Sequence, residues 1–334
     1  MNKSIKILIN ILVFLLIGGF VWYMIHTVNK DESPVEQSEV LENDDFISPY
    51  RLVSSFETKG TIRSFDLYKD HIYVSAKDSV FVFDLSGTEH HHFSIAADHR
   101  DMIIKDDRIY LLYPARIEIY TLSGEKLKEW EACSEHSDYC SMTLSTDYIF
   151  VTDAENKNIC QYTREGNFIK FIKSPKGFII PSYSFDIINM NDTLYCANSG
   201  RHSIESYTLN GDFITAFGTS GEEAGAFAGC CNPAYLAQTS RGDILASEKG
   251  IPRISCYGKN GKFRTILFNS KLLGGGNTAY EVKIADDYIF TAGNKQISIF
   301  RFDPELAEQS SCAGCTADCP MRENISDSRF QISN

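Results

Sequence analysis

Six copies of one short motif run along the chain, and this repetition restricts the fold more than any other feature. In each copy a polar residue is followed by an apolar triplet. The copies are DHIYVSA (70–76), DRIYLLY (107–113), DYIFVTD (147–153), DTLYCAN (192–198), GDILASE (242–248) and DYIFTAG (287–293). The step between copies runs from 37 residues, between Ile72 and Ile109, to 50 residues, between Leu194 and Ile244. A period of this kind is typical of repeat architectures.

A second apolar motif follows each copy, and after five of the six copies a glycine-containing turn comes next. The second motifs are VFVFD (80–84), IEIYT (117–121), ICQYT (159–163), IESYT (204–208), ISCYG (254–258) and ISIFR (297–301). The turns are LSGTE (85–89), LSGEK (122–126), REGNF (164–168), LNGDF (209–213) and KNGKF (259–263). Strands that are apolar on both faces are buried on both sides. Together with a repeat of about 40 residues, this pattern predicts a β-propeller with four strands per blade.

The last copy lacks the glycine turn, because ISIFR runs directly into FDPEL (302–306). Its blade therefore misses an outermost strand. At the other end of the repeat region, YRLVSSF (50–56) is an apolar stretch with no unit of its own. We expect this stretch to supply the missing strand, because closing the ring removes an open sheet edge. The fold class that follows is all-β, a six-bladed β-propeller over residues 48–305, closed by an N-terminal strand.

The N-terminal segment predicts attachment to a membrane. Residues 7–28 contain no Asp, Glu, Lys or Arg and are long enough to span a bilayer as one transmembrane helix. Lys3 and Lys6 precede the run, which favours a cytoplasmic N-terminus and an exported remainder. No A-x-A cleavage site follows, so we expect an anchor rather than a removed signal peptide. Residues 1–28 are then a cytoplasmic stub and the helix, in the cytoplasmic membrane of a bacterial cell, with the propeller in the periplasm or its extracytoplasmic equivalent.

Charge excludes one class of partner and predicts a spacer. The chain has a formal net charge of −12 and no basic stripe, so nucleic acid is not expected to bind. Residues 29–47 carry seven acidic residues against Lys30, a composition that indicates an acidic flexible linker.

Residues 217–263 resemble an NHL repeat. The family unit combines an FG pair, a glycine-rich loop ending in G-x-F, a proline before the first strand, an R-I-x-x-F/Y strand and a GKF turn. The matching positions are Phe217, Gly218, Gly221, Gly225, Phe227, Pro233, Gly242, Ile244, Arg253, Ile254, Tyr257, Gly261 and Phe263. Glu248 stands where the family has Asp. Residues 198–218 match more weakly, and the other units keep only the skeleton of strands and turns.

The resemblance implies a six-bladed propeller and a choice of functions. NHL-like propellers mostly bind other molecules, and a minority are lyases or lactonase-like hydrolases. The leading expectation is a membrane-anchored binding or assembly platform, with a protein or small-molecule ligand on the propeller face, where loops carry the contacts. A lyase or hydrolase is an alternative. The chain has no G-x-S-x-G, H-E-x-x-H or P-loop motif to favour an enzyme.

Cysteine placement raises a further alternative, a redox or metal protein of the envelope. Cys160, Cys196 and Cys256 fall within strand motifs and are expected in the core. Cys133 and Cys140 share one loop and are candidates for a disulfide. The C-terminal tail, residues 306–334, carries a C-x2-C-x3-C-P pattern. A second loop carries the adjacent residues Cys230 and Cys231. Together with the tail cysteines they form a candidate set for Zn, an iron–sulfur cluster or disulfides: Cys230, Cys231, Cys312, Cys315 and Cys319.

Histidine and arginine residues give weaker candidates. His90, His91 and His92 are expected on an exposed outer strand, where alternate side chains point in opposite directions. His99, His136 and His202 fall in loops expected on the channel face, where NHL-like amidating lyases hold Zn with three histidines. Arg201 and Arg253 precede equivalent strands and either line a rim for an acidic ligand or pair with neighbouring acids.

Overall fold

The computed structural model describes residue 15, residues 17–19 and residues 46–310. The chain divides into two units, residues 1–43 and 44–334. In the first unit, the described residues are helical. Within the described part of the chain, no helix has the length and apolar character needed to cross a bilayer. Most of the predicted span at 7–28, most of the acidic linker and the tail cysteines 312, 315 and 319 lie outside the described residues.

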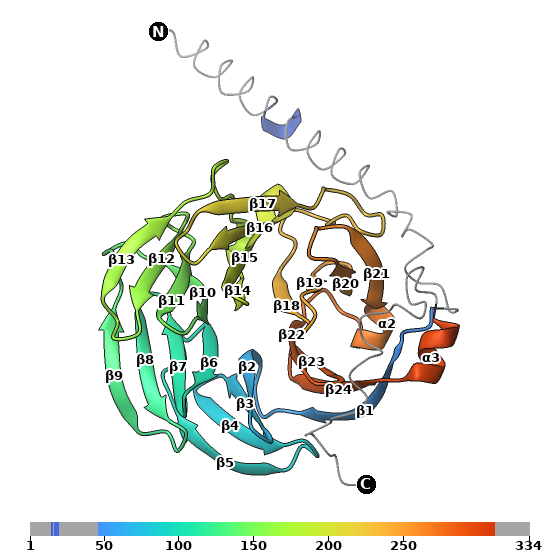
Figure 1. Ribbon diagram of the computed structural model, residues 1–334, viewed down its shortest axis with the longest axis horizontal. Coiled ribbons are helices and arrows are strands. Elements are labelled where there is room, and N and C mark those ends of the chain that lie inside the picture. The colour runs from blue at the N-terminus through green and yellow to red at the C-terminus, as the bar shows by residue number, and fades with distance from the viewer. Residues whose placement is uncertain (1–14, 16, 20–45, 311–334) are drawn as a thin grey trace. The chain divides into compact units, whose positions relative to one another are not determined.

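Residues 46–310 form six four-stranded antiparallel sheets around a common axis, so the prediction of a six-bladed propeller is confirmed (Figure 1). Blade 1 contains β2 (Ile62–Tyr68), β3 (His71–Ala76), β4 (Ser79–Asp84) and β5 (Glu89–Ser94). Blade 2 contains β6 (Asp101–Lys105), β7 (Arg108–Tyr113), β8 (Arg116–Thr121) and β9 (Lys126–Glu131). Blade 3 contains β10 (Tyr139–Leu144), β11 (Tyr148–Asp153), β12 (Asn158–Thr163) and β13 (Phe168–Ile172).

The remaining blades follow the same order. Blade 4 contains β14 (Ile187–Met190), β15 (Thr193–Asn198), β16 (Ser203–Thr208) and β17 (Phe213–Phe217). Blade 5 contains β18 (Tyr235–Gln238), β19 (Ile244–Glu248), β20 (Arg253–Tyr257) and β21 (Phe263–Phe268). Blade 6 contains β22 (Glu281–Ala285), β23 (Tyr288–Gly293), β24 (Gln296–Phe302) and β1 (Tyr50–Glu57). The connections include η1 (Pro181–Tyr183), η2 (Ser199–Arg201) and α2 (Ser270–Leu273), and α3 (Pro304–Gln309) follows the last strand.

The ring is closed by the N-terminal strand, as predicted. β1 pairs antiparallel with β24 and forms the outer edge of blade 6. The register places Tyr50 opposite Phe302 and Phe56 opposite Ile297. Next to this junction, the amide of Asp303 donates a hydrogen bond to the Pro49 carbonyl at 2.9 Å. The two ends of the propeller segment are therefore joined by main-chain hydrogen bonds.

The apolar triplets form the second strand of each blade and are buried on both faces. In β3, Ile72 and Val74 pack in a cluster with residues of blade 6, such as Phe290. Tyr73, which points the other way, packs in a cluster with Met102 of blade 2. Each apolar cluster of this kind lies between two neighbouring blades, so the core is a set of layers between the blades.

One glycine turn has a role beyond the hairpin itself. Gly87, between β4 and β5, has a φ of +84°, a backbone conformation that residues other than glycine rarely adopt. A Cβ at this position would lie 2.7 Å from Cδ1 of Phe56. Phe56 belongs to the closing strand β1, and its ring lies 4.8 Å from that of Phe83. Glycine at position 87 therefore allows the outer strand of blade 6 to pack closely against blade 1.

Candidate ligand-binding channel at the propeller axis

The innermost strands of the six blades surround a cavity of about 670 Å³. These strands are β2, β6, β10, β14, β18 and β22, and they lie nearest the centre of the ring (Figure 1). All six contribute residues to the lining. The cavity is a property of the whole ring, since no single blade could form it.

One equivalent position in each blade points to this cavity. It lies eight residues before the first apolar residue of the triplet motif, and it is polar in five of the six blades. The residues are Ser64, Asp101, Ser141, Asp186, Leu236 and Glu281. Sequence reasoning missed this ring because only one residue per repeat carries it. The constant offset from the triplet is the signal that could have found it.

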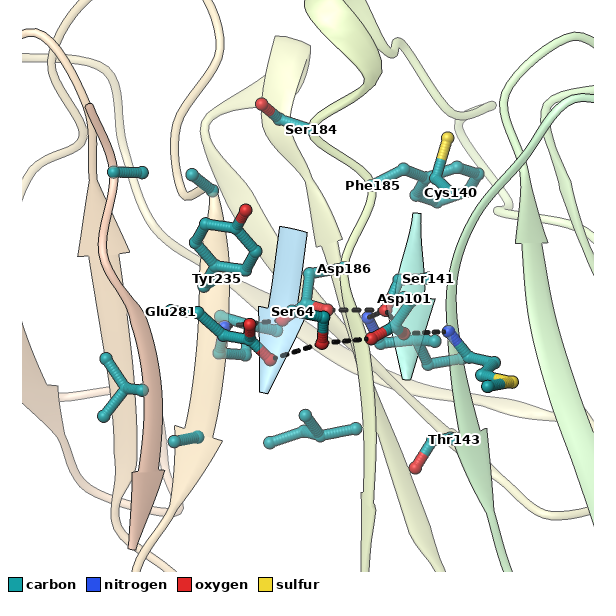
Figure 2. A pocket seen from close by; sticks show the side chains of 18 of the residues that line it. Ser64, Asp101, Cys140, Ser141, Thr143, Ser184, Phe185, Asp186, Tyr235 and Glu281 are labelled. Carbon is teal, nitrogen blue, oxygen red and sulfur yellow. Dashed lines mark hydrogen bonds between the residues drawn. The ribbon is translucent and has the colours of Figure 1, made fainter. Parts of the chain in front are cut away.

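The polar members of this ring form a continuous hydrogen-bonded chain (Figure 2). Ser64 Oγ lies 2.9 Å from Asp101 Oδ1 and 3.1 Å from Glu281 Oε1. Ser141 Oγ lies 3.2 Å from Asp101 Oδ2 and 2.7 Å from Asp186 Oδ1. Two hydroxyl groups have two protons, whereas these contacts require four. A carboxylic proton on Glu281 supplies one of the missing two, because Glu281 can then donate to Ser64 while Ser64 donates to Asp101.

The pKa values of the carboxyl groups agree with this count. Burial, together with the negative charges of Asp101 and Asp186, raises the pKa of Glu281 to about 8, against the attraction of Lys283. Burial and the charge of Asp101 raise the pKa of Asp186, although the hydrogen bond from Ser141 opposes the shift. Burial also raises the pKa of Asp66, a fourth carboxyl group on β2. Glu281 thus holds its proton close to neutral pH.

The same carboxyl groups connect consecutive blades through main-chain amides. Glu281 Oε2 accepts a hydrogen bond from the Phe65 amide at 3.1 Å, and Asp66 Oδ2 accepts one from Ile104 at 2.7 Å. The Met142 amide donates to Asp101 Oδ2 at 2.8 Å. The Leu236 amide donates to Asp186 Oδ2 at 2.7 Å. These side chains therefore hold the ring together as well as lining it.

Lys283 is the counter-charge within the channel. Its Nζ lies 3.2 Å from Glu281 Oε1. Burial opposes the charged form, but the attraction of Glu281, Asp66, Asp101 and Asp186 outweighs burial and raises the pKa of the Lys283 ammonium group. One lysine thus faces four carboxyl groups. Once Glu281 loses its proton, the balance favours a further positive charge in the channel.

Loops before β6 and β14 and after β19 contribute further residues to the cavity lining. Tyr183, in η1, is 61% exposed, and the Arg100 guanidinium lies 4.9 Å from the centre of its ring. Arg100 also forms a 2.6 Å ion pair with Asp138. Lys249 Nζ donates to Ser184 Oγ at 3.2 Å. The lining therefore includes an exposed aromatic ring and two basic side chains that already have partners.

The three candidate histidines do not form a metal centre in the structure. His99 is buried, its Nδ1 lies 3.2 Å from the Ala96 carbonyl, and burial lowers the pKa of its imidazole. His136 is exposed, and His202 Nε2 contacts the Gly229 carbonyl. Among residues 46–310, no group of three or more His, Cys, Asp or Glu side chains is arranged to hold a metal ion.

The two loop cysteines, Cys133 and Cys140, have different neighbours. Cys133 Sγ lies 3.4 Å from Cys160 Sγ, whereas Cys140 lies in the cavity lining, 3.9 Å from Arg100 Nη1. Both loop cysteines are thiols in the structure, and the disulfide between them stays a prediction. Cys160, Cys196 and Cys256 are buried, as expected.

Cys230 and Cys231 lie side by side, with their Sγ atoms 3.3 Å apart. Cys230 is exposed and Cys231 is buried. Burial alone would raise the pKa of Cys231, but hydrogen bonds from Lys249 and Cys230 lower it below its ordinary value. The structure does not describe the tail cysteines, so the proposed five-cysteine set stays untested.

The remaining candidates have structural partners. His90, His91 and His92 are exposed on β5, as expected for an outer strand. Arg201 Nε donates to the Gly177 carbonyl at 2.7 Å. Arg253 is 1% exposed and forms an ion pair with Glu248. Both arginines therefore pair with neighbours rather than forming an open rim.

Comparison with known proteins supports the fold and goes no further. No protein-family model matches the sequence, and no curated protein matches it. Among solved structures, virginiamycin B lyase from Staphylococcus aureus is similar, with a TM-score of 0.54 and 13% identity over 76% of this chain and 100% of that chain. A protein of unknown function from Bacteroides thetaiotaomicron gives a TM-score of 0.56 and 10% identity over 75% of each chain. The Neurospora crassa Pan2 WD40 domain gives a TM-score of 0.52 and 8% identity over 76% of this chain and 95% of that chain. The shared feature is the β-propeller.

Proposed function

We propose that the protein is a membrane-anchored binding platform whose axial channel receives a cationic group. The group would be an amine or guanidinium, carried by a small molecule or by a side chain of a protein partner. The observation that carries this proposal is the cavity of about 670 Å³ lined by Asp101, Asp186 and Glu281. Rigid concave sites with few convergent polar groups are the usual form of a binding pocket.

Electrostatics select the charge of the ligand. Glu281 holds its proton because its carboxyl group is buried and lies close to other negative charges, and the same causes raise the pKa of Asp186. A cation placed among these carboxyl groups takes over the role of that proton, since an opposite charge stabilises the ionised form. Binding is then coupled to proton release. Its affinity rises with pH between about 6 and 8, as Glu281, with a pKa raised to about 8, loses its proton.

The test uses the full chain in detergent and two cationic probes, spermidine and arginine methyl ester, followed by isothermal titration calorimetry. We expect binding that strengthens with pH. In Glu281→Gln, which keeps a hydrogen bond to Ser64, the pH dependence should be reduced. In Asp186→Asn, affinity should fall about 10- to 100-fold, because one buried charge partner is lost. Asp212→Asn, in an exposed turn, is the matched control and should bind as the wild type does.

Two results would overturn the channel assignment. One is failure of both cationic probes to bind the folded protein at any pH in this range. The other is an affinity that Asp186→Asn and Asp212→Asn change equally. Glutamate, as an anionic probe of similar size, should not bind, and tighter binding of glutamate than of the cations would reverse the proposed charge of the ligand.

The location outside the cytoplasmic membrane rests on the sequence. Residues 7–28 contain no charged side chain, and Lys3 and Lys6 precede them, which favours export of the C-terminal part. Protease added to intact spheroplasts should digest the linker at 29–47 and release the propeller. Protection of the linker until the membrane is permeabilised would place the propeller in the cytoplasm.

A second candidate function is metal or redox chemistry at Cys230, Cys231, Cys312, Cys315 and Cys319. The observation that favours it is the contact of the Cys230 and Cys231 sulfur atoms beside Lys249. Four thiolates suffice for a closed Zn or iron–sulfur site. Metal analysis and a visible spectrum of the anaerobically purified full chain test this candidate. Bound metal that is lost in Cys315→Ser but retained in Cys256→Ser would support it, and a metal-free protein with no visible absorption would reject it.

A further inference from the structure

Two cysteines that are 27 residues apart in the chain meet at the edge of blade 3. Cys133 lies in the loop between β9 and β10, and Cys160 lies on β12. Their Sγ atoms are 3.4 Å apart. Cys160 is fully buried, whereas Cys133 is half-buried. The arrangement is asymmetric, because one thiol can be reached through the loop and the other lies behind it.

Tyrosine hydroxyls surround the outer thiol. Tyr139 Oη lies 3.6 Å from Cys133 Sγ and contacts Tyr162 Oη. The Cys133 amide donates to both hydroxyls, at 3.1 Å to Tyr139 and 3.2 Å to Tyr162. These contacts fix the start of the loop and place the Tyr139 hydroxyl, which is itself in contact with Tyr162, beside the sulfur atom. Donors in this position stabilise a thiolate.

The two thiols differ in acidity in the direction that the geometry suggests. The hydrogen bond with Cys160 lowers the pKa of Cys133, and the hydroxyls of Tyr162 and Tyr139 lower it further, against burial and the charge of Asp153. Contact with the Cys133 thiolate and burial raise the pKa of Cys160, and Asp153 adds to this shift. Asn158 Oδ1, 3.5 Å from Cys160 Sγ, is an alternative acceptor for the single proton of this thiol. No positive charge takes part, so the asymmetry depends on hydrogen bonds.

We propose that Cys133 and Cys160 form a thiol–disulfide exchange site that reduces a disulfide substrate. The Cys133 thiolate attacks one sulfur of the substrate, the substrate S–S bond breaks, and the first half leaves as a thiolate. Cys160 then gives its proton to that leaving thiolate or to water and attacks Cys133 Sγ. The second half of the substrate leaves as a thiolate. The protein dithiol loses two electrons, and the substrate disulfide gains them.

The geometry assigns the order of the two steps. Of the two thiols, Cys133 is the one that combines partial exposure with a stabilised thiolate, and thiolates are the attacking species. Cys160 already stands 3.4 Å behind the sulfur that it must attack. Closing this distance to a bond of about 2.05 Å requires a small movement of the loop. Glu135 and His136, further along that loop, are exposed, so that part of the loop does not oppose the movement, whereas the amide contacts of Cys133 limit it.

The experiment uses the full chain, reduced and then exposed to oxidised glutathione at pH 7. Acid quenching, alkylation and peptide mapping identify the products. We expect a Cys133–Cys160 disulfide in the wild type. In Cys160→Ser, which lacks the second thiol, the mixed disulfide on Cys133 should accumulate. In Cys133→Ser, glutathione should not become attached to Cys160. Cys196→Ser removes a buried thiol elsewhere and should leave the products unchanged.

Reactivity provides a second readout that simple burial would not produce. Iodoacetamide should modify Cys133 at least about tenfold faster than Cys140 at pH 7, because an ordinary thiol is only a few per cent ionised there. Burial raises the pKa of Cys140 to about 12, although it too is half-buried. The proposal fails if oxidation joins Cys133 to Cys140 or to a tail cysteine, or if Cys133 and Cys140 react at equal rates. Neither result depends on ligand binding in the channel.

Discussion

Glu281, on the first strand of the last blade, accepts a hydrogen bond from the amide of Phe65, on the first strand of the first blade, at 3.1 Å. The two residues are 216 positions apart in the chain. The same carboxyl group contacts Ser64 and Lys283. The Glu281 side chain therefore joins the last blade to the first, belongs to the hydrogen-bonded chain of the channel, and forms an ion pair with Lys283.

Replacement of Glu281 should separate these roles. Glu281→Ala leaves the buried Phe65 amide without its acceptor, and we expect a loss of about 1–3 kcal/mol in the free energy of unfolding. Glu281→Gln keeps an acceptor oxygen and should lose less. Urea unfolding followed by tryptophan fluorescence measures both. Equal stability of the alanine variant and the wild type would show that the bond across the ring contributes nothing.

The pH dependence of stability should also change in Glu281→Gln. The folded state raises the pKa of Glu281 to about 8, from the 4.5 of an ordinary glutamate side chain. Between these two values the folded chain binds the proton that the unfolded chain releases, so this residue makes stability fall as pH rises. Glutamine has no such proton. The difference in unfolding free energy between Glu281→Gln and the wild type should therefore shift in favour of the variant between pH 5 and 8.

Removal of the closing strand should disrupt the ring. Deletion of residues 50–57 takes away β1, leaves β24 with an unpaired edge and removes Phe56 from its contact with Phe83. We expect a lower midpoint and a broader, less cooperative transition in scanning calorimetry of the full chain. A transition as sharp and as high as that of the wild type would mean that the remaining strands close without it.

The turn at Gly87 offers a test of packing between blades. Gly87→Ala adds a Cβ 2.7 Å from Phe56, at a residue with a φ of +84°. Gly177→Ala is the matched control, because Gly177 has a φ of +76° and nothing within 4 Å of the added Cβ. The control should lose about 1–2 kcal/mol from backbone strain, and Gly87→Ala should lose more in the same chemical denaturation experiment. Equal losses would show that Phe56 moves aside without cost.

The buried ion pair in blade 5 should be sensitive to loss of one partner. Arg253 and Glu248 are almost completely buried, and Arg253→Ala would leave a buried carboxyl group without its cation. We expect a loss of about 3–5 kcal/mol. Arg301→Ala, which breaks the exposed pair with Asp287, should cost less than about 1 kcal/mol. Similar losses at the two sites in chemical denaturation would contradict the role of burial.

The sequence predicted the blades and their closure because those features repeat. A triplet such as Ile72–Val74 is apolar on both faces, and six copies of it leave little choice of architecture. The stretch 50–56 could be assigned because the last blade visibly lacked a strand. These predictions depended on local pattern and on the need to pair every edge, both of which can be read along the chain.

The channel and the thiol pair could not be predicted in the same way. Asp101, Asp186 and Glu281 are single residues at the start of different inner strands, and only closure of the ring brings them together. Cys160 looks like an ordinary core residue within ICQYT (159–163), and its contact with Cys133 depends on how the loop between β9 and β10 returns to blade 3. The three histidines lie in loops, as expected, but His99 is buried and His136 is exposed.

The pairing of β1 with β24 means that the ring can close only after almost the whole propeller has been synthesised. β1 is the first propeller strand to leave the ribosome, and its partner at residues 296–302 is the last. Blades 1 to 5 have all their strands before blade 6 is complete, because their pairings are local. A nascent chain or a truncated product that stops before residue 296 keeps β1 without its partner. The ring therefore closes only when translation of the propeller is complete. Unfinished copies expose a strand edge of the kind that chaperones and proteases recognise.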